Sequence, residues 1–226
     1  MNNYFNTKRT SEEYFFKEMS TEKELLEELM AIVDKCIDLF EAKAGNSNGY
    51  HLICGISLIK ARNYFLICLS SALDGLAQEG GALLRPMLEY IELLQYFQED
   101  SARVKQAQED KLPNAGKRAK MINSSFQDLR KYLNEEASHS SFKENSIGHV
   151  VTNSDNLLKN QNFSEKNLST NIQFILIFLY YMAAVSVNCL NIQEQGSAEK
   201  EAIQLMIIRE QRMKKLDIVV RNITVK

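Results

Sequence analysis

The chain has 226 residues, of which 45% are hydrophobic and 25% are charged, and its formal net charge at pH 7 is -2. A chain of this length and apolar content can bury a core, which excludes disorder of the whole chain. The near-neutral charge excludes a global attraction to nucleic acid or to an anionic membrane, so such binding would need a local patch. Two prolines, nine glycines and long stretches of helical apolar spacing predict an all-α fold.

The N-terminal part of the chain predicts two helices. Residues 1–20 are polar with aromatic inserts and predict a short helix that packs on the body of the protein. Thr21-Glu22-Lys23-Glu24 matches a capping box, and an apolar stripe at helical spacing follows it. Gly45 is expected to end this second helix.

Two further helices are expected in the middle of the chain. A long helix is predicted over about 51–77, with Arg62 in an otherwise apolar stripe. The segment 78–81, Gln-Glu-Gly-Gly, is expected to be loose. Pro86 fits the first turn of a fourth helix over about 83–99, because its missing N–H would be unpaired there anyway.

The remaining chain alternates polar connections and helices. Residues 100–118 predict a charged connection, and 119–136 predict a fifth helix with an apolar core face made by Ile122, Phe126, Leu129 and Leu133. Residues 140–171, rich in Ser and Asn, predict a long functional or mobile loop. Helices are then expected over 171–192 and 198–217, the last of them charged and placed at an edge or on a partner chain.

Without the N-terminal helix over 1–20, which we treat as an extension, these elements predict one up-and-down helical bundle of about five to six helices, with the long polar loop before the penultimate helix. We divide the chain into an N-terminal extension (1–20), a bundle domain (21–195) and a charged C-terminal helix (196–226). Four widely spaced cysteines predict reduced core thiols in a cytoplasmic protein. The apolar run 174–187 is shorter than the roughly 20 residues of a membrane span, so we expect no membrane insertion.

The fourth predicted helix carries a narrow polar strip. At about 100° per residue, Glu89, Glu92 and Tyr96 fall within about 40° of Arg85, and apolar side chains cover most of the rest of the helix. The simplest interpretation is an ion pair between Arg85 and Glu89, four residues apart. The alternative is the lining of an internal site, because buried charges need hydrogen bonds or a ligand. Arg62 is a candidate structural partner for Glu89 or Glu92.

His139 is the candidate general acid or base. It follows the fifth predicted helix, where its simplest role is to cap the last carbonyl groups. An imidazole also suits proton transfer near neutral pH, and Asn134 and Ser138 would then orient the ring or the substrate. Acidic residues spaced for two-metal chemistry are missing, and we predict no metal and no other cofactor, although Glu89, Glu92 and His139 together could hold one ion.

Residues 103–120 form a local basic patch, with six basic and two acidic side chains. The simplest interpretation is a solvated connection. The alternative is a phosphate contact surface, in which Lys117 and Arg118, with Lys120, neutralise an RNA or nucleotide backbone without reading its sequence.

Two motifs occur in a fixed order. Leu84-Arg85-Pro86-Met87-Leu88-Glu89 follows a long helix and a glycine turn, and Leu129-Arg130-Lys131-Tyr132-Leu133-Asn134 leads to Ser138-His139. This order resembles the HEPN-like (higher eukaryotes and prokaryotes nucleotide-binding) helical proteins of bacteria, over about residues 55–192. The resemblance implies a bundle that often forms homodimers and occurs in toxin and antiphage systems.

Active members of that family cleave RNA without a metal, using an Arg and a His about four to six residues apart. In this chain eight residues separate Arg130 from His139, so Arg85 or Arg130 would have to reach His139 through the fold or from a second subunit. We therefore expect a homodimeric protein that binds RNA or a nucleotide-like ligand, with ribonuclease chemistry through His139 and an arginine.

Two other functions stay open. One is a non-catalytic interaction module or scaffold, whose apolar last helices and charged C-terminal helix bind a protein partner. The other is a small-molecule binder with a pocket between the helices predicted over 83–99 and 119–136.

Overall fold

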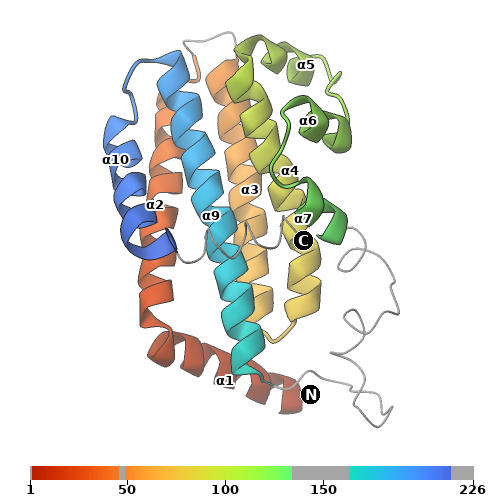
Figure 1. Ribbon diagram of the computed structural model, residues 1–226, viewed down its shortest axis with the longest axis vertical. Coiled ribbons are helices and arrows are strands. Elements are labelled where there is room, and N and C mark those ends of the chain that lie inside the picture. The colour runs from red at the N-terminus through yellow and green to blue at the C-terminus, as the bar shows by residue number, and fades with distance from the viewer. Residues whose placement is uncertain (1, 46–48, 134–162, 215–226) are drawn as a thin grey trace.

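The computed structural model describes residues 2–45, 49–133 and 163–214, and these form a helical bundle without strands. The all-α prediction is confirmed. Four long helices form the body of the bundle (Figure 1): α2 (Ser20–Lys43), α3 (Tyr50–Leu73), α4 (Ala77–Glu99) and α9 (Glu165–Gln193). The shorter elements are α1 (Asn2–Glu18), η1 (Ser101–Arg103), α5 (Val104–Gln108), α6 (Ala115–Met121), α7 (Gln127–Tyr132), α10 (Glu199–Ile208) and a π-helical turn, η3 (Arg209–Met213).

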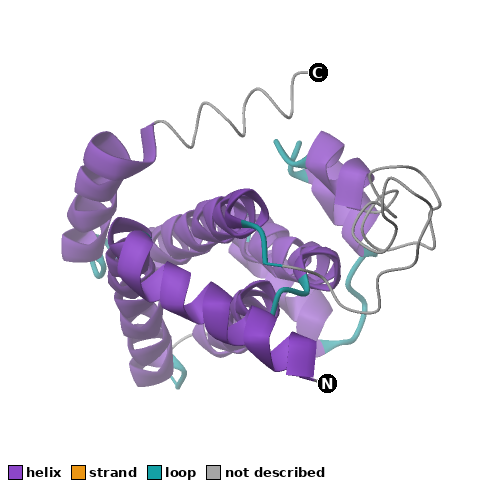
Figure 2. Cartoon of the chain, turned by 90° about the horizontal axis from the view of Figure 1, so that it is seen from below, coloured by secondary structure: helices purple, strands orange, loops and turns teal. Residues whose placement is uncertain are grey.

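The long helices pack around one core, and the shorter elements cover its outside. α9 contacts α2, α3 and α4, and α3 lies against α4 along most of its length. α1 crosses one end of the bundle, as the view from below in Figure 2 shows. α10 packs beside α2 and α9, while α5, α6 and α7 lie along the outer side of α4. The core contains several large side chains of negligible exposure: Phe40, Phe65, Tyr96, Phe97 and Phe178.

Two of the described helices, α3 and α9, are long and apolar enough to cross a membrane. Two-thirds of the most apolar window of α9 is buried inside the bundle, which is typical of the core helix of a soluble protein. α3 differs, because only 39% of its window is buried. The four cysteines are free and buried, as the sequence predicted.

The start of α2 differs from the predicted capping box. α2 begins at Ser20, Met19 is its N-cap residue, and Thr21 lies within the first turn without acting as a cap. Backbone hydrogen bonds run through the corner between α1 and α2, from Met19 N to Phe15 O at 3.2 Å and from Lys23 N to Met19 O at 3.0 Å. Lys23 is thus the first residue of α2 whose N–H bonds within the helix, and α2 begins without a side-chain cap.

The connection between α3 and α4 is a tight turn over residues 74–76. Gly75 has a φ of 77°, in the left-handed region. Leu76 N donates to Ser71 O at 2.8 Å, and Gly75 N donates to Ala72 O at 3.2 Å. This pair of bonds is the Schellman arrangement, which ends α3 and satisfies its last carbonyl groups.

α4 therefore begins at Ala77, and the predictions of a loose segment at 78–81 and of a helix starting near 83 are wrong. Gly80 and Gly81 lie inside α4, and Pro86 lies in its interior rather than in its first turn. Glycine and proline weaken a helix, but α4 packs against α3 and α9 along its length. Tertiary packing outweighs local propensity here.

Replacing Gly75 with alanine is expected to lower the free energy of unfolding by about 1–2 kcal/mol, because an alanine resists the left-handed conformation. The added Cβ would also lie 2.8 Å from Thr7 Cγ2 of α1. Urea denaturation would measure the loss. Gly81→Ala is the matched control: its Cβ meets nothing within 4 Å in α4, so we expect equal or higher stability, by up to about 1 kcal/mol.

The fifth predicted helix, over 119–136, is interrupted. α6 ends before Asn123, whose φ is 44°, and Ser124 Oγ accepts a hydrogen bond from Phe126 N at 3.1 Å before α7 begins. The prediction of one continuous helix is therefore wrong for its described part, which ends at residue 133. Its predicted core face is confirmed, because every member is at most 4% exposed: Ile122, Phe126, Leu129 and Leu133.

The last two helices lie close to their predicted places. α9 begins at Glu165, before the predicted 171, and Ser164 Oγ caps it by accepting from Asn167 N at 3.3 Å. α10 and η3 together cover most of the helix predicted over 198–217. The greater part of the predicted polar loop, residues 140–162, lies outside the described residues.

Candidate functional site

The polar strip of α4 is covered by the segment that carries α6 and α7. Glu92 is only 1% exposed and accepts a hydrogen bond from Ser124 Oγ at 2.6 Å. Its other carboxylate oxygen accepts from Arg130 Nη2. Arg130 Nη1 donates to Glu89 Oε1 at 3.3 Å. These four residues, which we call the Glu92–Arg130 network, fasten α7 to α4.

The predicted ion pair within α4 is present. Arg85 Nε donates to Glu89 Oε1 at 3.2 Å, and both side chains are about one-third exposed. Farther along the strip, Tyr96 OH donates to Gln106 Oε1 of α5 at 2.9 Å, and the Arg103 guanidinium lies 4.3 Å from the centre of the Tyr96 ring. The strip is therefore an attachment surface for the covering helices.

Arg62 does not bind this strip. Its Nε donates to Asp34 Oδ1 at 2.6 Å and its Nη2 to Asp34 Oδ2 at 3.3 Å. The prediction that Arg62 partners Glu89 or Glu92 is wrong, because the position of Arg62 on α3 faces α2.

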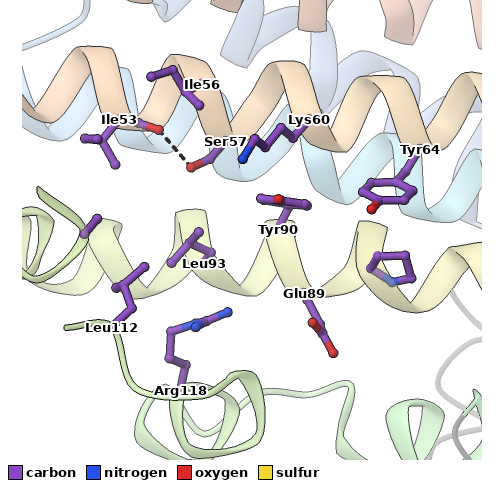
Figure 3. Close-up of a pocket in the computed structure, with 12 residues that line it drawn as sticks. Ile53, Ile56, Ser57, Lys60, Tyr64, Glu89, Tyr90, Leu93, Leu112 and Arg118 are labelled. Carbon is purple, nitrogen blue, oxygen red and sulfur yellow. Dashed lines mark hydrogen bonds between the residues drawn. The ribbon is translucent and has the colours of Figure 1, made fainter. Parts of the chain in front are cut away.

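A groove of about 410 Å³ lies beside the network, between α3, α4 and the α5–α6 segment (Figure 3). Three groups of side chains line it. The apolar ones are Ile53, Ile56, Pro86, Leu93, Ala107 and Leu112; the charged ones are Lys60, Glu89 and Arg118; the remaining ones are Ser57, Tyr64 and Tyr90. The fold thus brings together two residues that the sequence singled out separately, Glu89 and Arg118.

Arg118 is the most unusual member of the groove lining. It projects from α6 toward α4, and its guanidinium lies between Leu93 and Glu89 in Figure 3. Nη1 donates to Pro113 O at 2.6 Å, whereas Nε is buried and has no hydrogen-bond partner among the described residues. Burial lowers the pKa of Arg118, because desolvation disfavours the charged form, while Glu89 opposes this shift. A charged group thus lies on the groove wall with part of its hydrogen-bonding capacity unused.

The opposite wall carries two aromatic rings and a second cation. The rings of Tyr64 and Tyr90 are stacked, with centroids 6.1 Å apart and planes 27° from parallel. Lys60 Nζ lies 5.9 Å from the centre of the Tyr90 ring. Ser57 Oγ donates to Ile53 O at 2.8 Å, so its proton is already used within α3.

The balance of charge in the groove is positive. Among the described lining residues, Glu89 contributes the single negative charge, and it already accepts hydrogen bonds from Arg85 and Arg130. Arg118 and Lys60 face no further carboxylate in this described part of the lining. The groove therefore favours an anion.

Sequence reasoning missed Lys60, Tyr64 and Tyr90. A helical wheel of α3 places Ile53, Ser57, Lys60 and Tyr64 on one face, at spacings of three and four residues. This spacing could have predicted that these side chains share one wall of a site. It could not predict the position of Arg118, because that position depends on the packing of α6 on α4.

The other predicted site residues that the structure describes do not line the groove. Lys117 is exposed, and its backbone N–H is capped by Asn114 Oδ1 at 2.9 Å. His139, Asn134 and Ser138 lie outside the described residues, so the structure does not test a meeting of His139 with Arg85 or Arg130. Within the described ranges, no group of three or more His, Cys, Asp and Glu side chains is placed to hold a metal ion.

Comparison with protein-family models, curated proteins and solved structures gave no match for this chain. The resemblance to HEPN-like proteins therefore stays a prediction, and the functional argument depends on the geometry of the groove.

Proposed function

We propose that the groove between α3, α4 and α6 binds a small anionic ligand that carries a flat ring, as a nucleotide does. The observation that carries this proposal is the Arg118 guanidinium, half-buried on the groove wall with an Nε that has no hydrogen-bond partner in the described part of the chain. A buried guanidinium is costly unless it is paired, and carboxylate or phosphate is its best partner.

The size and lining of the groove support a ligand of this kind. A volume of about 410 Å³ lies within the range of roughly 300–1,000 Å³ that small-molecule sites occupy. Lys60 supplies a second cation, and the rings of Tyr64 and Tyr90 offer an aromatic surface for a base. The apolar side chains around them would exclude water from the ring.

Titration calorimetry with AMP, GMP, CMP and UMP as probes tests this proposal. We expect at least one nucleotide to bind, and its nucleoside to bind at least about tenfold more weakly because it lacks the anion. Arg118→Gln should weaken nucleotide binding by roughly 10- to 100-fold, which corresponds to one lost charge-assisted hydrogen bond.

Lys117→Gln is the matched control, because Lys117 is the neighbouring cation on α6 but does not line the groove. It should leave nucleotide affinity within about twofold of the parent protein. Equal affinity of both variants, or no binding of any probe at millimolar concentration, would overturn the proposal. If instead a short RNA binds with steep salt dependence and both variants weaken it alike, the basic surface of 103–120 is the phosphate contact.

A second candidate function, a protein-interaction module, is favoured by the surface of α10. Its side chains Ile203, Met206 and Ile207 are between 41% and 59% exposed, which leaves an apolar patch beside charged residues. The ribonuclease hypothesis is separate from both, since it depends on His139 outside the described residues.

A further inference from the structure

One segment of the groove wall lies between two left-handed corners of the backbone. Among the described residues, the non-glycine residues with a positive φ are Asp110, at 53°, and Asn123, at 44°. At each corner, this residue and the next donate their N–H groups to carbonyls of the preceding helix, α5 or α6, at 2.7–3.3 Å. Both corners are Schellman arrangements with Asp or Asn in the position usual for glycine. They bound residues 111–122, which we call the α6 flap.

The α6 flap is anchored weakly, whereas the chain on both sides of it is held firmly. Two small or medium side chains of the flap are fully buried, Ala119 at 2% and Ile122 at 4% exposure. Before the flap, Val104 is 2% exposed. After it, the Glu92–Arg130 network and the buried ring of Phe126 hold the chain on the core. A segment with few buried apolar contacts between firm flanks is typical of local opening.

The flap also carries a cation that opposes its own docking. In the closed flap, Arg118 Nε is buried and has no hydrogen-bond partner among the described residues. The bond from Arg118 Nη1 to Pro113 O lies within the flap, so it does not fasten the flap to the body. Glu89 attracts the guanidinium, but its carboxylate already accepts from Arg85 and Arg130. Opening would return Arg118 to water, so its desolvation weakens the closed state.

We infer that the α6 flap opens in the ligand-free protein and that an anionic ligand holds it closed through Arg118. This inference rests on the proposed function and adds the regulation of that site. The flap contributes Leu112 and Arg118 to the groove, and α3 and α4 contribute the facing walls (Figure 3). An anion that accepts from Arg118 offsets the desolvation cost and bridges the flap to Lys60 of α3. Because the complete site exists only in the closed form, binding shifts the population toward it.

Hydrogen exchange followed by mass spectrometry on the full chain tests the ligand-free half of this inference. We expect amides of the flap to exchange at least about 100-fold faster than those of α4, because local opening exposes them. Arg118→Met should slow exchange in the flap by about threefold or more, since an apolar side chain has no charge to desolvate. Lys117→Met is the matched control. Lys117 is an exposed cation of the same helix, so flap exchange should stay within about twofold of the parent protein.

The ligand half uses AMP, GMP, CMP and UMP as probes, each added at ten times its dissociation constant. A nucleotide that binds should slow exchange in the flap by about tenfold, as expected for a ligand that binds only the closed form. At the same nucleotide concentration, Arg118→Met should show no such slowing, because it lacks the group that connects the ligand to the flap.

Each arm has a result that contradicts it. Flap amides that exchange as slowly as those of α4, or an Arg118→Met flap that exchanges at the parent rate or faster, would overturn the opening of the flap. A nucleotide that binds through Arg118 yet leaves flap exchange unchanged would overturn the linkage, while the proposed function stands. If no nucleotide binds, the proposed function and the linkage fail together, and ligand-free exchange still decides whether Arg118 opposes closure.

Discussion

Replacing Arg130 with methionine is expected to lower the free energy of unfolding by about 3–5 kcal/mol, because the substitution leaves a buried carboxylate without its charged partner. That carboxylate belongs to Glu92, which is 1% exposed and would retain only the hydroxyl of Ser124 among its described partners. Arg130 itself is 11% exposed along its side chain, so water cannot easily replace it. Chemical denaturation followed by circular dichroism measures the loss.

Two further variants separate the buried pair from ordinary surface charge. Arg85→Met removes the ion pair with Glu89, whose two side chains are about one-third exposed, and should cost at most about 0.5 kcal/mol. The double variant Glu92→Met with Arg130→Met should recover most of the stability, since no buried charge then remains. If Arg130→Met lowered the free energy of unfolding no more than Arg85→Met, this would contradict the inference that the buried carboxylate of Glu92 needs Arg130 as its charged partner.

Phe178→Ala is expected to cost about 3–5 kcal/mol, the usual effect of removing a fully buried ring. Phe178 lies in α9 at 0% exposure, and its ring stacks on that of Phe126, with centroids 6.2 Å apart. The substitution therefore opens a cavity at the place where the segment before α7 docks on the core. Thermal and urea denaturation would both report the loss.

The control for this cavity is a phenylalanine of the same size that lies at the surface. Phe16 of α1 is 58% exposed, so Phe16→Ala should change the free energy of unfolding by less than about 0.5 kcal/mol. A loss below about 1 kcal/mol for Phe178→Ala would mean that the surrounding helices collapse into the cavity, and the core would be less rigid than its packing indicates.

Arg130→Met and Phe178→Ala both act on the attachment of α6 and α7 to the bundle. The same attachment also positions the residues that line the groove. Arg118 belongs to α6, and α6 contacts the body of the protein through α4. Destabilising variants of the network are therefore expected to weaken ligand binding as well as stability. For this reason, the test of the proposed function uses Arg118 and Lys117, which lie outside the network.

Helical periodicity predicted the elements that depend on a continuous apolar face. α2, α3 and α9 lie close to their predicted ranges, and the predicted core side chains of the fifth helix are buried. The errors fall where local propensity and packing disagree. Gly80, Gly81 and Pro86 predicted a break and a later start for α4, but the chain turns at Gly75 and packing keeps the rest helical.

The candidate site was predictable only in pieces. The pairing of Arg85 with Glu89 followed from their four-residue spacing, because such neighbours meet within one helix. The pairing of Glu92 with Arg130 could not be predicted in this way, because the two residues are 38 positions apart. Arg62, which is nearer to Glu92 in the sequence, binds Asp34 instead. No spacing rule covers contacts between helices.

The sequence by itself determined that this protein is helical, that its cysteines are buried and that α4 carries one polar strip, because these properties depend on composition and on a period of 3.6 residues. Only the tertiary structure decided what the strip contacts, where Arg118 lies and which face of α3 stays exposed. The physical reason is that side chains far apart in the chain meet through the packing angles and turns of whole helices, and a residue pattern within one helix does not contain those angles.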